Sequence, residues 1–96
     1  VIESRGLGDV YKRQEMIRLG LAACLKVTKV DSIYQWNGET ASNPEWAIQV
    51  KTSLSSKSNL VEWLKENHPN EVPEIISWQV SVEEDYHTWV QTETSK

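Results

Sequence analysis

The sequence predicts an α+β fold, the ferredoxin-like βαββαβ sandwich with an added C-terminal helix. The first observation is the order of hydrophobic patterns after residue 14, which reads helix, strand, strand, helix, strand, helix. The second is size: 96 residues, 39% hydrophobic and 25% charged, suit one small globular domain. The βαββαβ order needs one strand ahead of the first helix, so we expect that first strand to be missing.

The segment 1–14 differs in character from the rest of the chain. It has two glycines, scattered charges and no sustained period, and its run Asp9–Gln14 resembles the translation of an adaptor used in sequencing libraries. We expect residues 1–14 to be a non-native or disordered segment, with a natural flexible arm as the alternative. The folded domain is then expected over residues 15–96.

Residues 15–23 are expected to form the last turns of the first helix. Met16, Leu19 and Ala23 recur at helical spacing. Gly20 is unfavourable inside a helix by about 1 kcal/mol, which indicates an approaching end.

The next element is a long strand over residues 24–36, and its pattern changes midway. Leu25 and Val27 share one parity, whereas the even-numbered residues from Val30 to Trp36 share the other. A one-residue shift turns every side chain to the opposite face of a sheet. We therefore expect a bulge near Thr28–Lys29.

A turn and a second strand come next. Asn37–Gly38 is a strong hairpin signal, although Thr40–Pro44 suggests a loop longer than two residues. Glu45–Thr52 then alternates as a half-buried strand does. The apolar positions of that strand are Trp46, Ile48 and Val50.

The second half of the chain predicts a helix, a strand and a final helix. Ser53–Ser58 offers helix caps, and the helix runs to about Asn67, where His68–Pro69 ends it. A third strand is expected over Glu74–Val80. Negative charge suits a helix N-terminus, so Glu83–Asp85 begins the final helix. Its apolar stripe comprises Tyr86, Trp89 and Val90.

Composition and charge narrow the classes of function. A net charge of −4 without a basic stripe argues against nucleic-acid binding, and no run approaches the roughly 18 apolar residues that indicate a membrane span. The single cysteine, Cys24, excludes an intramolecular disulfide and favours a reducing setting, so we expect a cytoplasmic protein. No G-x-S-x-G, H-E-x-x-H or P-loop pattern occurs, and we expect no enzymatic activity.

Local motifs between Glu15 and Val90 resemble those of the CutA divalent-cation tolerance family. Each motif is short, but five of them in the right order and with family-like spacing are specific. One departure is Asn70, which stands where the family usually has a tyrosine. The motifs are Leu21–Cys24, Ser32–Gly38, Glu45–Thr52, His68–Ile75 and Asp85–Trp89.

The resemblance implies a homotrimer of ferredoxin-like subunits, similar in build to the PII nitrogen-regulatory proteins. It implies a non-catalytic metal-binding or signalling protein that contributes to metal-ion tolerance, with copper or another divalent cation held weakly. The alternative is a PII-like sensor that binds a small organic ligand at clefts between subunits. A third class, RNA binding, is disfavoured by the net charge.

Two residues are candidate metal ligands, His68 and Cys24. A neutral imidazole suits copper and zinc, and a thiol suits reduced copper. Tight sites usually take three or four protein ligands, so His68 would need Cys24 or further copies of the chain. The alternatives are that His68 caps the helix end and that Cys24 packs as a small apolar residue.

The remaining candidate residues are aromatic or charged and belong to the family-like motifs. A lysine opposed to a glutamate, with aromatic rings beside them, suits a small anionic or zwitterionic ligand. The same residues suit ion pairing and packing at a subunit interface, where tyrosine and tryptophan are enriched. The set comprises Trp36, Glu45, Lys51, Glu74, Tyr86 and Trp89.

Overall fold

The computed structural model of the protein describes residues 2–4, 10–67 and 74–95. Its elements follow the predicted order, with a short 3-10 turn added before the second helix. They are β1 (Ile2–Ser4), α1 (Val10–Arg18), β2 (Cys24–Trp36), β3 (Glu39–Lys51), η2 (Leu54–Ser56), α2 (Lys57–Asn67), β4 (Glu74–Ile75) and α3 (Glu84–Glu93).

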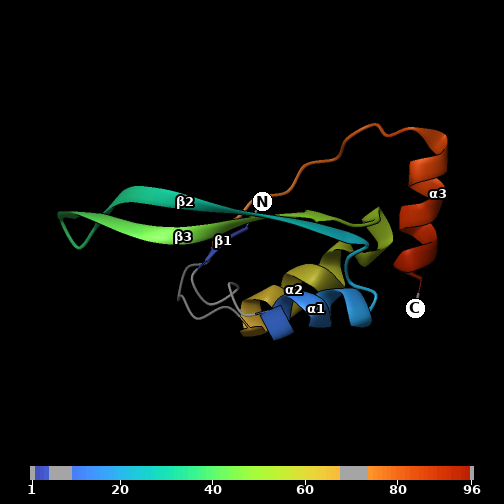
Figure 1. Ribbon diagram of the computed structural model, residues 1–96, viewed down its shortest axis with the longest axis horizontal. Coiled ribbons are helices and arrows are strands. Elements are labelled where there is room, and N and C mark those ends of the chain that lie inside the picture. The colour runs from blue at the N-terminus through green and yellow to red at the C-terminus, as the bar shows by residue number, and fades with distance from the viewer. Residues whose placement is uncertain (1, 5–9, 68–73, 96) are drawn as a thin grey trace.

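The strands form one four-stranded sheet in the order β2-β3-β1-β4, and every neighbouring pair is antiparallel. Helices α1 and α2 lie side by side on one face of this sheet (Figure 1). This is the α+β sandwich that the pattern of elements predicts. None of the described helices has the length and apolar character that a bilayer span requires.

The expected absence of a first strand is wrong, because residues Ile2–Ser4 form β1 between β3 and β4. The register pairs Ile2 with Ile48 on one side and with Ile75 on the other. A central strand provides hydrogen-bond partners for the backbone groups of the strands on both of its sides. With three residues, β1 does this only over a short length. Helix α1 begins at Val10, inside the segment 1–14. It ends at Arg18 and does not reach Ala23 as expected, because Gly20 takes a left-handed conformation (φ 72°). The non-native origin of that segment stays a prediction.

The long hairpin of β2 and β3 has no bulge. Its register runs without interruption from the Cys24–Lys51 pair to the Trp36–Glu39 pair, so the predicted bulge is wrong. The longer loop is also wrong: Asn37 (φ 52°) and Gly38 (φ 80°) form the whole connection. Positive φ at both central residues is the signature of the two-residue hairpin turn that matches strand twist. Strand β3 therefore starts at Glu39, six residues earlier than expected.

The change of apolar parity along β2 has a different cause from a bulge. Leu25 and Val27, paired with Val50 and Ile48, pack against the core beneath the sheet. Farther along the same face, Ile33 is 73% exposed, because the hairpin continues past the ends of α1 and α2 (Figure 1). We call residues 30–45 the arm. On the arm, Val30, Tyr34 and Trp36 of β2 lie on the face turned away from the helices, and of its apolar residues only Ile33 lies on the helix side.

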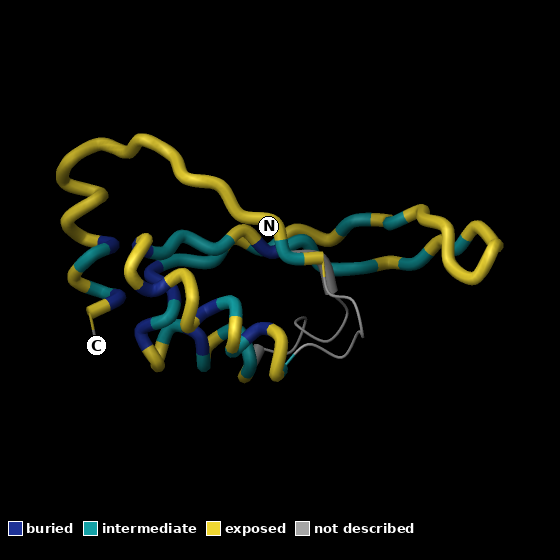
Figure 2. The backbone as a smooth tube through the Cα atoms, turned by 180° about the vertical axis from the view of Figure 1, so that it is seen from behind, coloured by how far each residue is buried: buried dark blue, intermediate teal, exposed yellow. Residues whose placement is uncertain are grey.

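The hydrophobic core lies between the helices and the base of the hairpin, where the buried segments gather in Figure 2. Strand β3 contributes Ile48 and α1 contributes Met16, both without any exposed surface. Helix α2 contributes Leu60 and Leu64, which recur at helical spacing on its inner face. Few large side chains are fully buried in this core: Met16, Ile48 and Leu64 among the described residues.

Of the predicted strand Glu74–Val80, only the first two residues form a strand, β4. The reason is that β1 offers ladder partners only opposite Glu74 and Ile75. The chain then runs without regular structure to α3, on the side of the sheet away from α1 and α2 (Figure 1). Helix α3 starts as predicted, because the Glu83 carboxylate accepts hydrogen bonds from the backbone N–H groups of Asp85 and Tyr86.

Candidate functional site

The base of the hairpin brings together several of the predicted site residues. Cys24 and Lys51 are direct cross-strand partners there, and their side chains share the sheet face opposite α1 and α2. Helix α3 reaches the same end of the sheet (Figure 1) and brings Tyr86 close to the Cys24 thiol. Cys24 is half-buried, and its Sγ lies 3.9 Å from the carbonyl oxygen of Leu25.

The two aromatic residues of α3 form one unit at this site. The rings of Tyr86 and Trp89 have centroids 5.6 Å apart and planes inclined at 37°. Both side chains remain partly open to solvent. Partial burial raises the pKa of the Tyr86 hydroxyl above its usual value, and the charge and hydrogen bonding of Cys24 raise it further. The Tyr86 hydroxyl therefore stays protonated, and able to donate, throughout the neutral range.

A cluster of hydroxyl groups, which we call the clamp, holds the C-terminal end of α3. Thr94 Oγ1 donates to Ser53 Oγ and to the Val90 carbonyl oxygen, at 2.8 Å in each case. Ser53 Oγ lies 3.1 Å from Ser56 Oγ, and Ser56 Oγ donates to the Thr94 carbonyl oxygen at 3.0 Å. All three side chains are buried, so these bonds are shielded from water. The clamp fixes α3, and with it Tyr86, against η2.

The clamp is a feature that sequence reasoning missed. Serines at 53–58 predicted helix capping, yet Ser53 makes no side-chain cap bond and turns to Thr94 instead. The two partners are 41 residues apart, and nothing in the local pattern around Thr94 links it to Ser53. Only the return of the chain to η2 brings the hydroxyl groups together.

Two predicted residues lie on the arm. Trp36 ends β2 beside the turn and is 53% exposed. Glu45 is half-buried and accepts a hydrogen bond from Ser32 Oγ at 3.0 Å, across the ladder. Near them, Asn43 Nδ2 donates to the Tyr34 hydroxyl at 2.7 Å. The arm face therefore combines aromatic rings with ordered polar groups.

The structure divides the predicted ligand set between the two ends of the hairpin. Trp36 lies beside the turn and Lys51 at the base, which at the usual rise per strand residue separates them by about 40 Å. Glu74, on β4, is exposed and lies across the sheet from both. One chain thus gathers Lys51, Tyr86 and Trp89 around the hairpin base, but not Trp36. That the whole set binds one ligand stays a prediction.

The metal hypothesis rests on two residues, of which the structure describes only one. His68, with Asn70, lies outside the described residues. Cys24 is described, and Tyr86 lies beside its thiol. Across residues 2–4, 10–67 and 74–95, no group of three or more histidine, cysteine, aspartate or glutamate side chains is placed to hold a metal ion.

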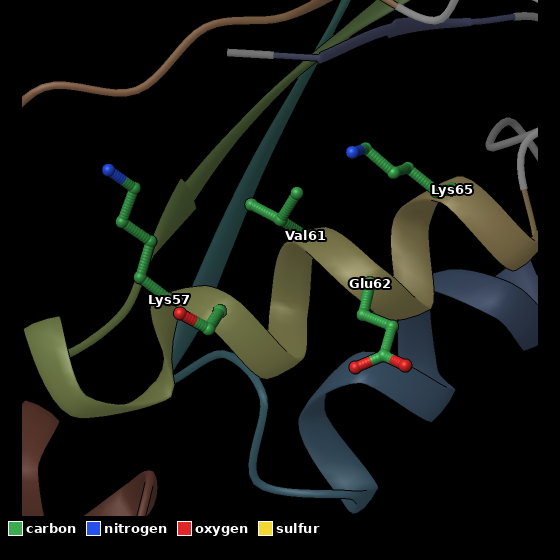
Figure 3. A pocket seen from close by; sticks show the side chains of 5 residues that line it. Lys57, Val61, Glu62 and Lys65 are labelled. Carbon is green, nitrogen blue, oxygen red and sulfur yellow. The ribbon is translucent and has the colours of Figure 1, made fainter.

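A groove of about 380 Å³ lies along α2, and none of the predicted site residues that the structure describes lines it. Lys57, Val61 and Lys65, spaced four residues apart, project from one side of the helix, while Glu62 projects from another (Figure 3). Ser58 completes the lining. Exposed lysines on such a stripe are typical of a solvated helix face, and this groove holds none of the chemistry that the hairpin base offers.

Comparison with known proteins agrees with this fold. The CutA1 divalent ion tolerance protein family matches residues 11–93. The chain is 32% identical to the divalent-cation tolerance protein CutA of Thermotoga maritima over 79 residues, which covers 81% of this chain and 78% of that protein. It is 34% identical to the Thermus thermophilus CutA over 76 residues, covering 77% and 74% of the two chains.

Solved structures point the same way. The fold is similar to the crystal structure of a point mutant of CutA1 from Pyrococcus horikoshii, with a TM-score of 0.91, 30% identity and coverage of 99% of this chain and 95% of that one. It is also similar to the PII-like protein CutA from Nostoc in its apo form, with a TM-score of 0.90, 26% identity and coverage of 97% and 92%. The chain therefore belongs to the CutA1 divalent ion tolerance protein family.

Proposed function

We propose that this chain contributes to tolerance of divalent metal ions, copper above all, as a non-catalytic, trimeric metal-binding or signalling protein of the cytoplasm. The observation that carries the proposal is the family match over residues 11–93. It is supported by relatives whose names describe divalent-cation tolerance and that align with more than three quarters of this chain.

Self-association is supported by apolar surface that one chain leaves uncovered. Tyr34 and Trp36 lie on the arm face turned away from the helices, and Trp78 and Val80 lie in the irregular segment before α3. All four are exposed. Several large apolar side chains left exposed are typical of protein interaction sites. A homotrimer would bury these residues at its interfaces.

The proposed metal ligands are Cys24 and His68, with equivalent residues from other copies. A thiol and an imidazole suit copper in its reduced and oxidised states respectively. The half-buried position of Cys24 beside Lys51 leaves its sulfur within reach of a small ion at the hairpin base. Two ligands hold a metal weakly, so the proposed affinity is modest and depends on assembly.

The test is native mass spectrometry of the full chain with increasing copper, for wild type and three alanine variants. Cys24→Ala and His68→Ala are expected to lose most of the bound copper, whereas His87→Ala, at the other histidine, keeps it. Uptake should occur in a fixed ratio to a species of three chains. A trimer that takes up no copper, or equal uptake by all three variants, would contradict the metal proposal.

The second candidate, a PII-like sensor of a small ligand, is favoured by the likeness to the PII-like CutA of Nostoc. It is also favoured by the arrangement of Lys51 with the Tyr86–Trp89 pair, which offers one cation and two aromatic rings. Glutamate and inorganic phosphate serve as zwitterionic and anionic probes in calorimetric titrations. Binding that falls on Lys51→Ala but not on His68→Ala supports the sensor, and the reverse pattern supports the metal proposal.

A further inference from the structure

Helix α3 is held to the rest of the fold by few buried contacts, and these lie toward its C-terminal end. Within the helix Val90 is buried, and Thr94, directly after it, is buried in the clamp. From Glu84 to Trp89 every residue is exposed. Among the described residues, no backbone–backbone hydrogen bond joins α3 to another element. The position of α3 therefore depends strongly on the clamp.

The segment that leads into α3 has no regular structure. Residues 76–83 are exposed, and Figure 2 shows them as one long exposed span. No hydrogen bond between described residues involves positions 77–82. Hinges are a few loop or element-terminal residues that absorb a change of backbone angles. Residues 81–83, directly before the helix, are suited to that role, and we call them the hinge.

The helix covers the one thiol of the chain. Cys24 stands on the sheet face that α1 and α2 do not cover, yet it is half-buried. Tyr86 of α3 lies beside that thiol, and Figure 1 shows α3 at this end of the sheet. Movement of α3 away from the sheet would therefore expose Cys24 together with its cross-strand partner Lys51.

The clamp has the chemistry of a latch that can be released. It consists of neutral hydroxyl groups that bond to one another and to backbone carbonyl oxygens while α3 is in place. After release each group can bond to water, so no polar group is left without a partner. The exposed Ser55 hydroxyl lies 3.2 Å from Ser53 Oγ and links the clamp to the surface. Few bonds between neutral groups are modest in net strength, so we expect a minor open state.

We propose that α3 is a hinged lid over Cys24, which the clamp holds closed and which opens about residues 81–83 to admit a metal ion to the thiol. This deepens the proposed metal binding and rests on it for the identity of the ligand. An ion that binds Cys24 only when the lid is open shifts the equilibrium toward the open state. Rotation at the hinge leaves residues 77–80 in place, so burial of Trp78 and Val80 in a homotrimer is compatible with it.

The first experiment measures access to the thiol without any metal. Iodoacetamide is a small neutral probe, and mass spectrometry of the full chain follows its reaction with the single cysteine. Reaction through the open lid proceeds at a rate proportional to the open fraction. Thr94→Val should therefore react roughly 5–30-fold faster than wild type, whereas Thr92→Val, at an exposed position of the same helix, should match wild type.

The second experiment closes the lid covalently. Thr94 Oγ1 and Ser53 Oγ are 2.8 Å apart, so cysteines at these two positions bring their sulfur atoms close enough to form a disulfide. In the double variant Ser53→Cys/Thr94→Cys, Cys24 should react at least about tenfold more slowly in the oxidised form than after reduction. Peptide mapping confirms the bond between positions 53 and 94 and distinguishes Cys24 from the added cysteines.

The third experiment adds copper and follows hydrogen exchange of α3. Copper bound at Cys24 favours the open lid, so peptides covering α3 should exchange faster with copper present, and Cys24→Ala should abolish that change. Peptides covering α2 provide the internal control.

The outcomes separate the lid from the proposal beneath it. Faster alkylation in Thr94→Val together with protection in the oxidised double variant supports the lid, and failure of either result would overturn it whatever copper does. Alkylation that follows the latch, in a chain that takes up no copper, would refute the proposed metal binding and the metal as the ligand admitted, while the lid over the thiol would stand.

Discussion

Replacing Thr94 with valine tests the claim that the clamp, rather than extensive packing, holds α3. Valine keeps the shape of threonine and removes only the hydroxyl group. That group has one hydrogen, shared between Ser53 Oγ and the Val90 carbonyl oxygen at 2.8 Å each. The bond from Ser56 to the Thr94 backbone survives, since it uses the carbonyl oxygen. The variant therefore loses one shared hydrogen bond and leaves Ser53 Oγ with one partner fewer.

The magnitude depends on burial. Thr94 is 8% exposed and Ser53 4%, so water cannot readily replace the lost bond. Removing one partner of a buried hydrogen bond costs about 1–2 kcal/mol. That cost corresponds to a factor of roughly 5–30 in the equilibrium for local opening. The effect should be confined to α3, because the core residues on α1, α2 and β3 are untouched.

Hydrogen exchange measured by mass spectrometry provides the assay. Peptides covering α3 should exchange roughly 5–30-fold faster in Thr94→Val, while peptides covering α2 should be unchanged. Thr92→Val is the matched control, because Thr92 is exposed on the same helix. Unchanged exchange in α3, or an equal rise in α2, would falsify the reasoning that the clamp anchors this helix.

Three further predictions concern the core, the turn and the hairpin base. Ile48→Ala should lower the free energy of unfolding by about 2–5 kcal/mol in urea titrations, because Ile48 has no exposed surface; equal loss in the exposed Ile33→Ala would contradict this. Gly38→Ala should cost about 1–2 kcal/mol through its φ of 80° alone, since no atom crowds the new Cβ, and a neutral result would contradict the turn geometry. Cys24→Ala should lower the pKa of Tyr86, followed by tyrosinate absorbance with Tyr86→Phe as the assignment control; burial should still keep that pKa above its usual value, and no change would contradict the contact. Because the folded pKa is raised, the stability linked to Tyr86 is present below about pH 10 and is lost as pH rises through the folded pKa, so Cys24→Ala should narrow that loss.

Much of the fold is dictated by local sequence signals, and the two later helices are the clearest cases. Helix α2 buries Leu60 and Leu64 at the spacing that predicted it, and it ends at Asn67 as expected. Helix α3 starts at the acidic cap because a carboxylate beside the first N–H groups is favourable whatever the rest of the chain does. Sequence signals whose interacting groups lie within one helical turn do not depend on the rest of the fold, so they can be predicted from the sequence.

The hairpin was harder to predict from its alternation of apolar and polar residues. That alternation depends on which other elements cover each face of the strand, as well as on the direction in which each side chain points. On the base, α1 and α2 cover one face, so Leu25 and Val27 are apolar there. On the arm, no helix covers that face, and the apolar parity changes without any shift of register. If the same elements are assumed to cover the whole strand, such a change of parity is interpreted as a bulge.

The site could be predicted only as a set of residue types. The motifs identified Lys51, Tyr86 and Trp89, and the structure brings the first two next to Cys24 through the strand pairing and the return of α3. The clamp could not be predicted, because each of its hydroxyl groups is ordinary in its own segment. Such contacts join residues that are far apart in the sequence, and no local pattern in a single sequence indicates them.

The distribution of large apolar side chains between core and surface links the proposed ligand set to the proposed self-association. Only Met16, Ile48 and Leu64 are large side chains that the described part of the chain buries completely, whereas Trp36, Trp78 and Val80 remain in water. A chain of this size that leaves Trp36, Trp78 and Trp89 exposed has little stability of its own, because small domains bury a modest share of their surface. Covering the arm and residues 77–83 with further copies would move that apolar surface out of water, and it would make folding depend on concentration. The same assembly would place the arm residue Trp36 of one copy beside another copy. The proposed ligand set and the proposed gain in stability would then both depend on self-association.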